Sequence, residues 1–237
     1  MKTFLVTGCS RGIGLATSCC LKEAGHQVVG IARKRSDIEY PGILYCADLT
    51  NTDETMVVFT KIKSEHSIDG IINNIGDVQP ALIENTTMES FFEVMDLNLR
   101  PAIQAVQTFL PDMKEKRWGR IVNIASRALL GKVGRSSYSA AKASLVALAR
   151  TWALEFAEYN ITVNVVAPGP VQTEAFSNNY PKGSVEEQRL IAALPLKRIG
   201  LPEEVAYAIA FFLDERANFI TGQTLFVDGG GSVGVVQ

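Results

Sequence analysis

The sequence predicts a single α/β domain over residues 1–237, built on a doubly wound parallel sheet with helices on both faces. Short, almost continuously apolar runs alternate with longer amphipathic stretches. Continuous apolar strands indicate burial on both faces, and alternation of strand with helix indicates parallel pairing. No linker, repeat or low-complexity stretch divides the chain, and 47% of its residues are hydrophobic, which is enough for one large core.

Seven runs have the length and composition of buried strands. In chain order they are TFLVT at 3–7, QVVGIA at 27–32, ILYCA at 43–47, DGIIN at 69–73, RIVNIA at 120–125, TVNVVA at 162–167 and TLFV at 224–227. The stretches between them are expected to be helical, so that strand and helix alternate strictly. Because ligands of an open parallel sheet bind beyond the carboxyl ends of its strands, a site is expected in the residues that follow these runs.

Composition and charge argue against several classes of protein. The formal net charge of −2 provides no general attraction to nucleic acid or to a membrane surface. The N-terminal MKTFLVTG is too short for a signal peptide and no later run is long enough to span a bilayer, so we expect a cytoplasmic protein. The four cysteines lack the spacing of zinc ligands. We therefore expect no metal, and reduced, mostly buried thiols.

The first predicted strand leads directly into a glycine-rich turn, TGCSRGIG at residues 7–14. Gly8, Gly12 and Gly14 would allow a tight turn, close approach of the backbone to a pyrophosphate, and close packing of the next helix on the strand. The start of that helix would then meet the negative charge of the phosphates. Many such turns are merely glycine-rich, but the position after the first strand favours a dinucleotide site.

The second predicted strand ends without an acidic residue. A carboxylate at this place commonly bonds the adenosine ribose hydroxyls of NAD. Here Ala32 occupies the place, and Arg33, Lys34 and Arg35 follow it. With Arg11 of the glycine loop, these cations could hold a ribose 2′-phosphate, which favours NADP(H) over NAD(H). The alternative is a solvated basic loop.

YSAAK at residues 138–142 places a phenol and an ammonium group four residues apart. If the segment is helical, Tyr138 and Lys142 lie on one face and can approach the same point. A nearby cation favours the phenolate and would bring the phenol toward a useful pKa for proton donation. The other interpretation is an ordinary surface pair, but the small residues around Tyr138 would let a cofactor approach closely.

Together TGCSRGIG, NNIG at 73–76, YSAAK and PGPVQT at 168–173 resemble the short-chain dehydrogenase/reductase family. In length and motifs the chain is most similar to its 3-oxoacyl-[acyl-carrier-protein] reductases. The resemblance implies a seven-stranded Rossmann fold and hydride transfer between a nicotinamide cofactor and a carbonyl or alcohol substrate. It also implies that Tyr138 donates the proton, that Ser126 bonds the substrate oxygen, and that Asn98 holds a water against Lys142.

The resemblance further assigns residues to the cofactor. Asp48 matches a residue that bonds the adenine, Asn74 one that lies against the ribose, and Thr173 one that holds the carboxamide. The whole expected cofactor set is Gly8, Ser10, Arg11, Gly12, Ile13, Gly14, Arg33, Lys34, Asp48, Leu49, Asn74, Gly76, Tyr138, Lys142, Pro168, Gly169, Val171 and Thr173. Two residues depart from the family's usual pattern: Ile75, and Cys9, which is expected to be a small apolar group rather than a reactive thiol.

The substrate is less well defined by the sequence. The loop at 127–137 carries Arg127, Lys132 and Arg135 and no acid, so it could attract an anionic substrate such as an acyl thioester, or it could be solvated. Arg117 matches one of the two basic residues with which the resembled reductases dock an acidic carrier protein, but Tyr159 stands where the other is expected.

Several alternatives remain open. The substrate could be a steroid, a sugar or a small carbonyl compound. The chain could also be a non-catalytic dinucleotide-binding sensor or scaffold, or a lyase or epimerase on the same fold. A homotetramer is expected from the resemblance and from the apolar stripes of the segments around residues 97–113 and 143–159.

Overall fold

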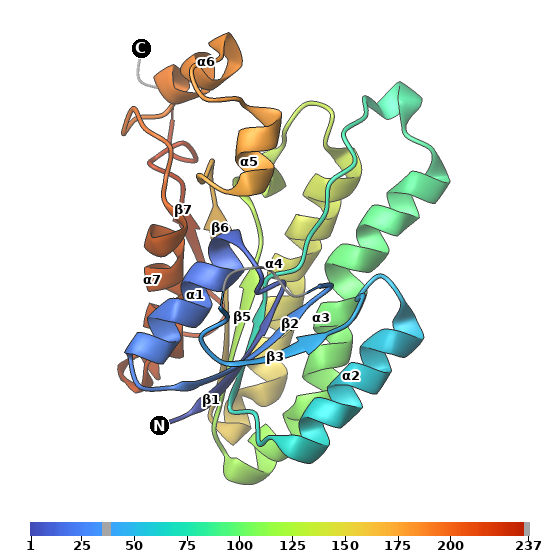
Figure 1. The fold of residues 1–237 in the computed structure, drawn as a ribbon, viewed down its shortest axis with the longest axis vertical. Helices are drawn as coiled ribbons and strands as arrows, with labels where there is room; N and C mark the ends of the chain where they lie inside the picture. The colour runs from blue at the N-terminus through green and yellow to red at the C-terminus, as the bar shows by residue number, and fades with distance from the viewer. Residues whose placement is uncertain (35–38, 235–237) are drawn as a thin grey trace.

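The computed structural model describes residues 1–34 and 39–234 and contains one seven-stranded sheet (Figure 1). All strand pairs are parallel, in the order β3-β2-β1-β4-β5-β6-β7. The strands are β1 (Thr3–Thr7), β2 (Gln27–Ala32), β3 (Ile43–Cys46), β4 (Gly70–Asn73), β5 (Gly119–Ile124), β6 (Ile161–Pro168) and β7 (Thr224–Val227). The strand order reverses between β1 and β4, which is where a doubly wound sheet opens a crevice for a ligand.

Helices cover both faces of the sheet. They are α1 (Gly12–Glu23), α2 (Thr52–Glu65), α3 (Met88–Lys116), α4 (Ser136–Phe156), α5 (Glu174–Asn179), α6 (Val185–Ala193) and α7 (Pro202–Leu213). Four short 3₁₀ turns are η1 (Ile83–Asn85), η2 (Arg127–Leu130), η3 (Ala157–Tyr159) and η4 (Glu215–Ala217). Figure 1 shows α1 and α7 on one face, α2, α3 and α4 on the other, and α5 and α6 beyond the carboxyl end of β6.

The sheet separates two hydrophobic clusters because successive strand residues point to opposite faces. Leu5 packs with Phe59, Phe109 and other residues under α2, α3 and α4. Its neighbour Phe4 packs with Leu21 of α1 and residues of α7. Burial on both sides explains why the strands are almost continuously apolar.

Side-chain oxygens fix the start of several helices. Asn51 Oδ1 accepts hydrogen bonds from the first-turn N–H groups of α2, and Thr87 Oγ1 does the same for α3. Thr173 Oγ1 accepts from Phe176 N at 3.2 Å and so begins α5. This cap fixes the chain just after β6, beside the crevice.

The predicted seven strands are confirmed, with ends that differ by one residue or match. The predicted strict alternation is wrong at one connection: within the described residues, the chain from β2 to β3 forms no helix. Tyr40 of this connection packs on the sheet instead. Its hydroxyl lies 2.9 Å from Ser18 Oγ of α1, and a Cβ added to Gly30 would collide with both Tyr40 and Cys9. One aromatic side chain thus fills part of the space that a helix would cover.

Two further expectations can be compared with the structure. Of the four free cysteines only Cys9 is buried; Cys19 and Cys20 are half-buried and Cys46 is exposed, so the expectation of mostly buried thiols is wrong. No helix within residues 1–34 and 39–234 is both long and apolar enough to cross a membrane.

Candidate active site

The expected site residues gather at the carboxyl edge of the sheet, because each follows a parallel strand. The glycine loop follows β1, Asn74 and Gly76 follow β4, Ser126 follows β5 and Thr173 lies beyond β6. This edge includes the crevice between β1 and β4.

The glycine loop has the geometry of a phosphate cradle. Gly8 and Gly12 have φ of +65° and +55°, a conformation that favours glycine, and a Cβ on Gly14 would collide with the Gly8 carbonyl oxygen. Asn74 Nδ2 donates to the carbonyl oxygens of Thr7 and Gly8, both at 3.1 Å. The residues present therefore fit a dinucleotide, since the loop is small, braced from β4 and leads into the start of α1.

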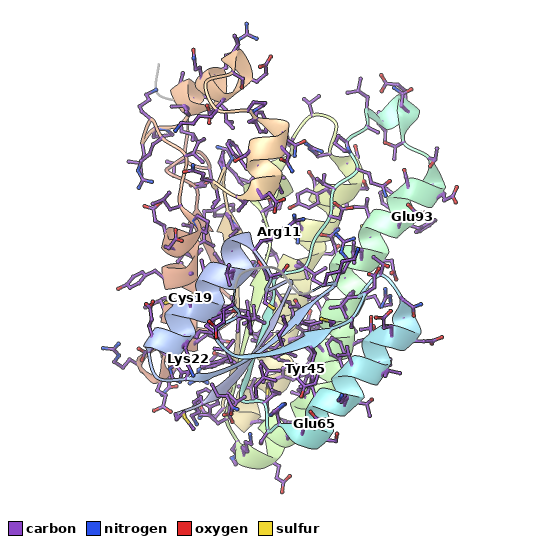
Figure 2. All side chains as sticks on the ribbon, viewed as in Figure 1. Arg11, Cys19, Lys22, Tyr45, Glu65 and Glu93 are labelled. Carbon is purple, nitrogen blue, oxygen red and sulfur yellow. The ribbon has the colours of Figure 1, made fainter. Side chains whose placement is uncertain are left out.

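Arg11 has an acidic partner in this structure. Its Nη1 lies 2.7 Å from Glu174 Oε2 at the start of α5, and both side chains are more than half exposed. Figure 2 shows Arg11 at the start of α1, facing α5. The ion pair joins the glycine loop to the segment after β6. Arg11 would have to break its ion pair with Glu174 in order to bind a 2′-phosphate. Arg33 and Lys34 are exposed at the end of β2, whereas Arg35 lies outside the described residues.

The other expected cofactor residues lie along the same edge. Asp48 Oδ1 accepts from Thr50 N and Oγ1, and these hydrogen bonds lower the pKa of the Asp48 carboxyl. Leu49 is buried and its carbonyl oxygen accepts from Arg100 at 3.0 Å. Five expected cofactor residues remain. Ser10 lies in the glycine loop and Ile13 at the start of α1. Pro168 ends β6, Gly169 N donates to Val227 O, and Val171 is buried.

Lys142 is buried beneath this edge, 3% exposed. Its Nζ donates to Ile124 O at 3.0 Å and to Ile75 O at 3.3 Å, which draws the ends of β5 and β4 together. Burial lowers the pKa of Lys142 to about 7. The side-chain nitrogen can therefore change between ammonium and neutral amine near neutral pH.

Tyr138 lies next to Lys142 on α4, with the Lys142 Nζ 5.6 Å from the centre of its ring. Burial raises the pKa of the Tyr138 phenol, while a hydrogen bond with Ser126 and the charge of Arg135 act to lower it. The expected lowering by Lys142 is not what this structure shows: burial dominates. Ser126 Oγ also accepts from Ala128 N at 3.2 Å, which begins η2 and fixes the serine beside the phenol.

Asn98 and Lys142 face a common point. Asn98 Nδ2 donates to Val94 O at 2.8 Å and Asp77 O at 3.0 Å, whereas its buried Oδ1 has no partner among the described residues. A Cβ added to Gly76 would lie 2.7 Å from Lys142 Nζ and 2.8 Å from Asn98 Oδ1. The absence of a side chain at residue 76 thus leaves room between these two polar groups.

A small cavity of about 10 Å³ lies behind Asn98, enough for about one water molecule. Asn73, whose Oδ1 is also buried and unpartnered within the described ranges, lines it, as does Pro101. Pro101 has no N–H, so the carbonyl oxygen of Leu97, another lining residue, lacks its usual helical donor. Sequence reasoning missed Asn73 and Pro101; the proline inside a predicted helix was the available signal.

We expect Gly76→Ala to lower kcat about 10²-fold, because the added methyl group displaces Lys142 or Asn98 by a fraction of an ångström or more. Steady-state kinetics with saturating cofactor measure the effect. Gly200→Ala is the matched control, since its nearest added contact is an ordinary 3.5 Å. An unchanged kcat in Gly76→Ala would show that the two groups can move apart without consequence.

Within the described part of the chain no three His, Cys, Asp or Glu side chains are placed to hold a metal ion. A glycine loop at the crevice of a parallel sheet, with serine, tyrosine and lysine at the same edge, defines a dinucleotide-dependent oxidoreductase that acts on carbonyl or alcohol groups.

The comparisons identify the family. A family model described as enoyl-(acyl carrier protein) reductase matches residues 8–232. The chain is 35% identical to the 3-oxoacyl-[acyl-carrier-protein] reductase FabG of Buchnera aphidicola over 97% of this chain and 96% of that protein. It is 34% identical to the acetoacetyl-CoA reductase of Shinella zoogloeoides over 95% and 96% of the two chains.

Solved structures agree with this result. A short-chain dehydrogenase/reductase family protein superposes with a TM-score of 0.89 at 34% identity, covering 98% of this chain and 97% of the other. YwfH, an NADPH-dependent reductase of bacilysin biosynthesis, gives 0.90 at 28% identity over 97% and 98%. A 4-hydroxyisoleucine dehydrogenase complexed with NADH gives 0.91 at 27% identity over 99% and 100%. The chain belongs to the short-chain dehydrogenase/reductase family.

Proposed function

We propose that the protein is an NADP(H)-dependent reductase that converts a ketone to a secondary alcohol. The first candidate substrates are 3-oxoacyl thioesters, because FabG and the acetoacetyl-CoA reductase are named for them. The observation that carries the proposal is the cluster of half-buried Ser126 and Tyr138 with buried Lys142 at the carboxyl edge of the sheet. A non-catalytic dinucleotide-binding protein would need the glycine loop but not this cluster.

In the proposed mechanism Ser126 and Tyr138 hydrogen-bond the substrate carbonyl oxygen. Hydride to the carbonyl carbon is the chemistry that the nicotinamide cofactor supplies when bound. Tyr138 donates its phenolic proton to the oxygen as the C–O bond becomes single. The products are the alcohol, the oxidised cofactor and a phenolate that must recover a proton.

Lys142 is proposed to restore that proton. A pKa of about 7 lets the ammonium group release and regain a proton at neutral pH. Asn98, whose Oδ1 faces the same point as Lys142 Nζ, is proposed to hold a water there and connect the lysine to solvent. Gly76 keeps the space open. The remaining cofactor residues expected from the sequence are proposed to bind along the edge as assigned above.

The choice of NADP(H) is supported by charge at the end of β2. Ala32 leaves no carboxylate to bond a 2′-hydroxyl, and Arg33 and Lys34 are exposed beside it. Fold alone does not decide the cofactor, since one similar structure is named as NADPH-dependent and another is complexed with NADH.

We expect Arg33→Ala to raise KM for NADPH about 10-fold and to leave KM for NADH nearly unchanged, because one charge-assisted hydrogen bond to the 2′-phosphate is lost. Initial rates with both cofactors measure this. Lys61→Ala, which removes a positive charge from the exposed side of α2, is the control. An equal effect on both cofactors would indicate that Arg33 does not contact the 2′-phosphate.

The surface expected to dock a carrier protein is incomplete. Arg117 Nη2 donates to Glu158 O at 2.6 Å, so its guanidinium is partly occupied by the protein's own backbone. Tyr159, in place of the second expected basic residue, lies under Lys114, whose Nζ is 4.5 Å from the ring centre. This arrangement gives less support to a carrier-linked substrate than to a smaller one.

The proposed function is tested by oxidation of NADPH, followed by absorbance, over a panel of substrates. The panel includes a carrier-linked 3-oxoacyl thioester, acetoacetyl-CoA, a steroid ketone, a sugar and a diketone, together with a 2-enoyl thioester because of the family model's description. Turnover of a ketone supports the proposal. Turnover of the enoyl compound alone, or NADPH binding without any turnover, would refute it.

We also propose that the protein works in the cytoplasm as a homotetramer. Support for the tetramer comes from exposed apolar side chains on α3 and α4. These are Phe92 of α3 and Leu154 of α4, of which Leu154 is 83% exposed. The mass in solution tests it, and a monomer would refute it.

A further inference from the structure

The active-site edge contains a guanidinium group that the proposed mechanism does not use. Arg135 immediately precedes α4 and lies three residues before Tyr138. Its carbonyl oxygen accepts from Ser139 N at 2.7 Å, and its backbone pairs with Ala81 as an isolated parallel bridge. The backbone of Arg135 is therefore held on two sides, which fixes where its side chain begins.

Within residues 1–34 and 39–234 the guanidinium group of Arg135 has no partner. The side chain is half-buried, its Nη1 is fully buried and has no hydrogen-bond acceptor there, and none of the ion pairs includes it. Two other arginines that are at least half-buried do have acceptors: Arg100 bonds Asp96 and several backbone oxygens, and both Nη atoms of Arg120 bond backbone or amide oxygens, although Arg120 Nε also lacks an acceptor among the described residues. A buried donor with no acceptor is unfavourable, and a water molecule or a bound ligand can supply the acceptor.

An acceptor for Arg135 would lie close to the Tyr138 phenol, where the proposed reaction occurs. The charge of Arg135 acts on the Tyr138 phenol, so the guanidinium lies within electrostatic range of the group that donates the proton. The charge of Asp77 acts on the same phenol in the opposite sense, yet Asp77 forms no ion pair with Arg135 in the described structure. A substrate whose carbonyl oxygen meets Ser126 and Tyr138 places its neighbouring groups near Arg135.

The positive side chains around Arg135 favour a negatively charged substrate group as its acceptor. Arg127, directly after Ser126, reaches the C-terminal segment at Gly231, and Lys132 lies 5.9 Å from the ring centre of Tyr180. Neither has an acidic partner among the described ion pairs. A guanidinium binds a carboxylate through two parallel hydrogen bonds and binds a neutral carbonyl oxygen less strongly. The site thus presents several positive side chains, and one of them, Arg135, has a buried Nη1 without an acceptor among the described residues.

We propose that Arg135 is a specificity-determining residue that binds a carboxylate of the substrate, and that the preferred substrate is an oxo acid whose carboxylate lies within a few bonds of the ketone. The inference rests on the proposed reduction of a carbonyl at Tyr138, and it puts a free oxo acid ahead of the thioester as the preferred substrate. The reaction itself is unchanged: the carbonyl carbon gains hydride from NADPH, the oxygen gains the Tyr138 proton, and NADP⁺ leaves. A 3-oxoacyl thioester offers only a neutral oxygen at the place where a 3-oxo acid offers a full charge.

The test compares an acid with its own ester. Acetoacetate and 3-oxohexanoate are assayed beside their methyl esters with NADPH, so that each pair has the same ketone and differs only in charge. We expect the wild type to have the higher kcat/KM for the acids. Arg135→Gln should lower kcat/KM for the acids at least about 10-fold while changing the esters less than about threefold.

Two further variants separate the effect of the Arg135 guanidinium geometry from the effect of positive charge in general. Arg135→Lys keeps the charge and loses the guanidinium geometry, so it should recover only part of the preference for acids. Arg127→Gln removes a nearby positive charge and should alter the acids only slightly, in a manner that added salt suppresses.

The outcomes separate the two proposals. If esters are reduced at least as well as acids by the wild type, the inference is wrong and the reductase stands; this comparison needs no variant to fold. If Arg135→Gln lowers kcat/KM for acids and esters equally, Arg135 does not bind the substrate carboxylate. If no carbonyl compound is reduced at all, the proposed function itself has failed.

Discussion

Tyr138→Phe is expected to lower kcat for carbonyl reduction about 10²–10⁴-fold, the usual contribution of a positioned general acid. The variant removes only the hydroxyl group, so the ring next to Lys142 and the backbone of α4 remain in place. Ser126 would still bond the substrate oxygen, but an unactivated serine hydroxyl is too weak an acid to replace the phenol as proton donor. The variant should therefore bind the cofactor with nearly unchanged affinity, while the rate of carbonyl reduction falls.

Stopped-flow mixing of enzyme, NADPH and substrate separates these two effects, because it reports binding and hydride transfer independently. Tyr207→Phe is the matched control, since it removes a phenolic hydroxyl from the outer side of α7, where the side chain is 75% exposed. If Tyr138→Phe retained hydride transfer at the wild-type rate, the proton would have to come from another group and the proposed mechanism would be wrong.

Lys142→Met is expected to abolish measurable turnover and at the same time to change how stability depends on pH. Burial holds the pKa of folded Lys142 at about 7, against 10.5 for the exposed side chain. Between these values the unfolded chain binds more protons than the folded one, so this group makes the wild type more stable as pH rises and less stable as pH falls toward 7. Methionine removes the ionisation and with it this contribution.

Urea unfolding of the ligand-free proteins at pH 7.0 and pH 8.5 measures the effect. The wild type should gain about 1.6 kcal/mol relative to Lys142→Met over this interval, because folded Lys142 is half protonated at pH 7.0 and the full slope of about 1.4 kcal/mol per pH unit is reached only at higher pH. Taking the difference between the two proteins removes the contribution of other groups that titrate in both. The exposed Lys22→Met should follow the wild type, and a Lys142→Met difference that is independent of pH would contradict the depressed pKa.

The parts of the site that the sequence predicts are those set by local spacing. Tyr138 and Lys142 lie on one helix, and the glycine loop is one turn between β1 and α1, so neighbouring residues suffice to place them. The strands were predictable for a related reason, because burial on both faces requires apolar residues in every position.

Contacts between distant segments could not be predicted in this way. Arg11 and Glu174 are 163 positions apart, and the bracing of the glycine loop by Asn74 spans more than 60. The sequence shows Arg135 only as one of several charges in a loop, because nothing in its neighbours indicates that its Nη1 is buried. The sign of the Tyr138 shift also depended on burial, which only the folded chain defines.

The packing of Tyr40 on the sheet has a consequence for oxidative damage. Tyr40 and Gly30 enclose Cys9, whose thiol is fully buried and whose pKa burial raises to about 12. Peroxide attacks thiolates, and on the order of one Cys9 in 10⁵ is ionised at neutral pH, so sulfenic acid forms there extremely slowly. The exposed Cys46 would be oxidised first. A cysteine inside the cofactor loop is thus compatible with an enzyme that keeps working when its surface thiols have been lost.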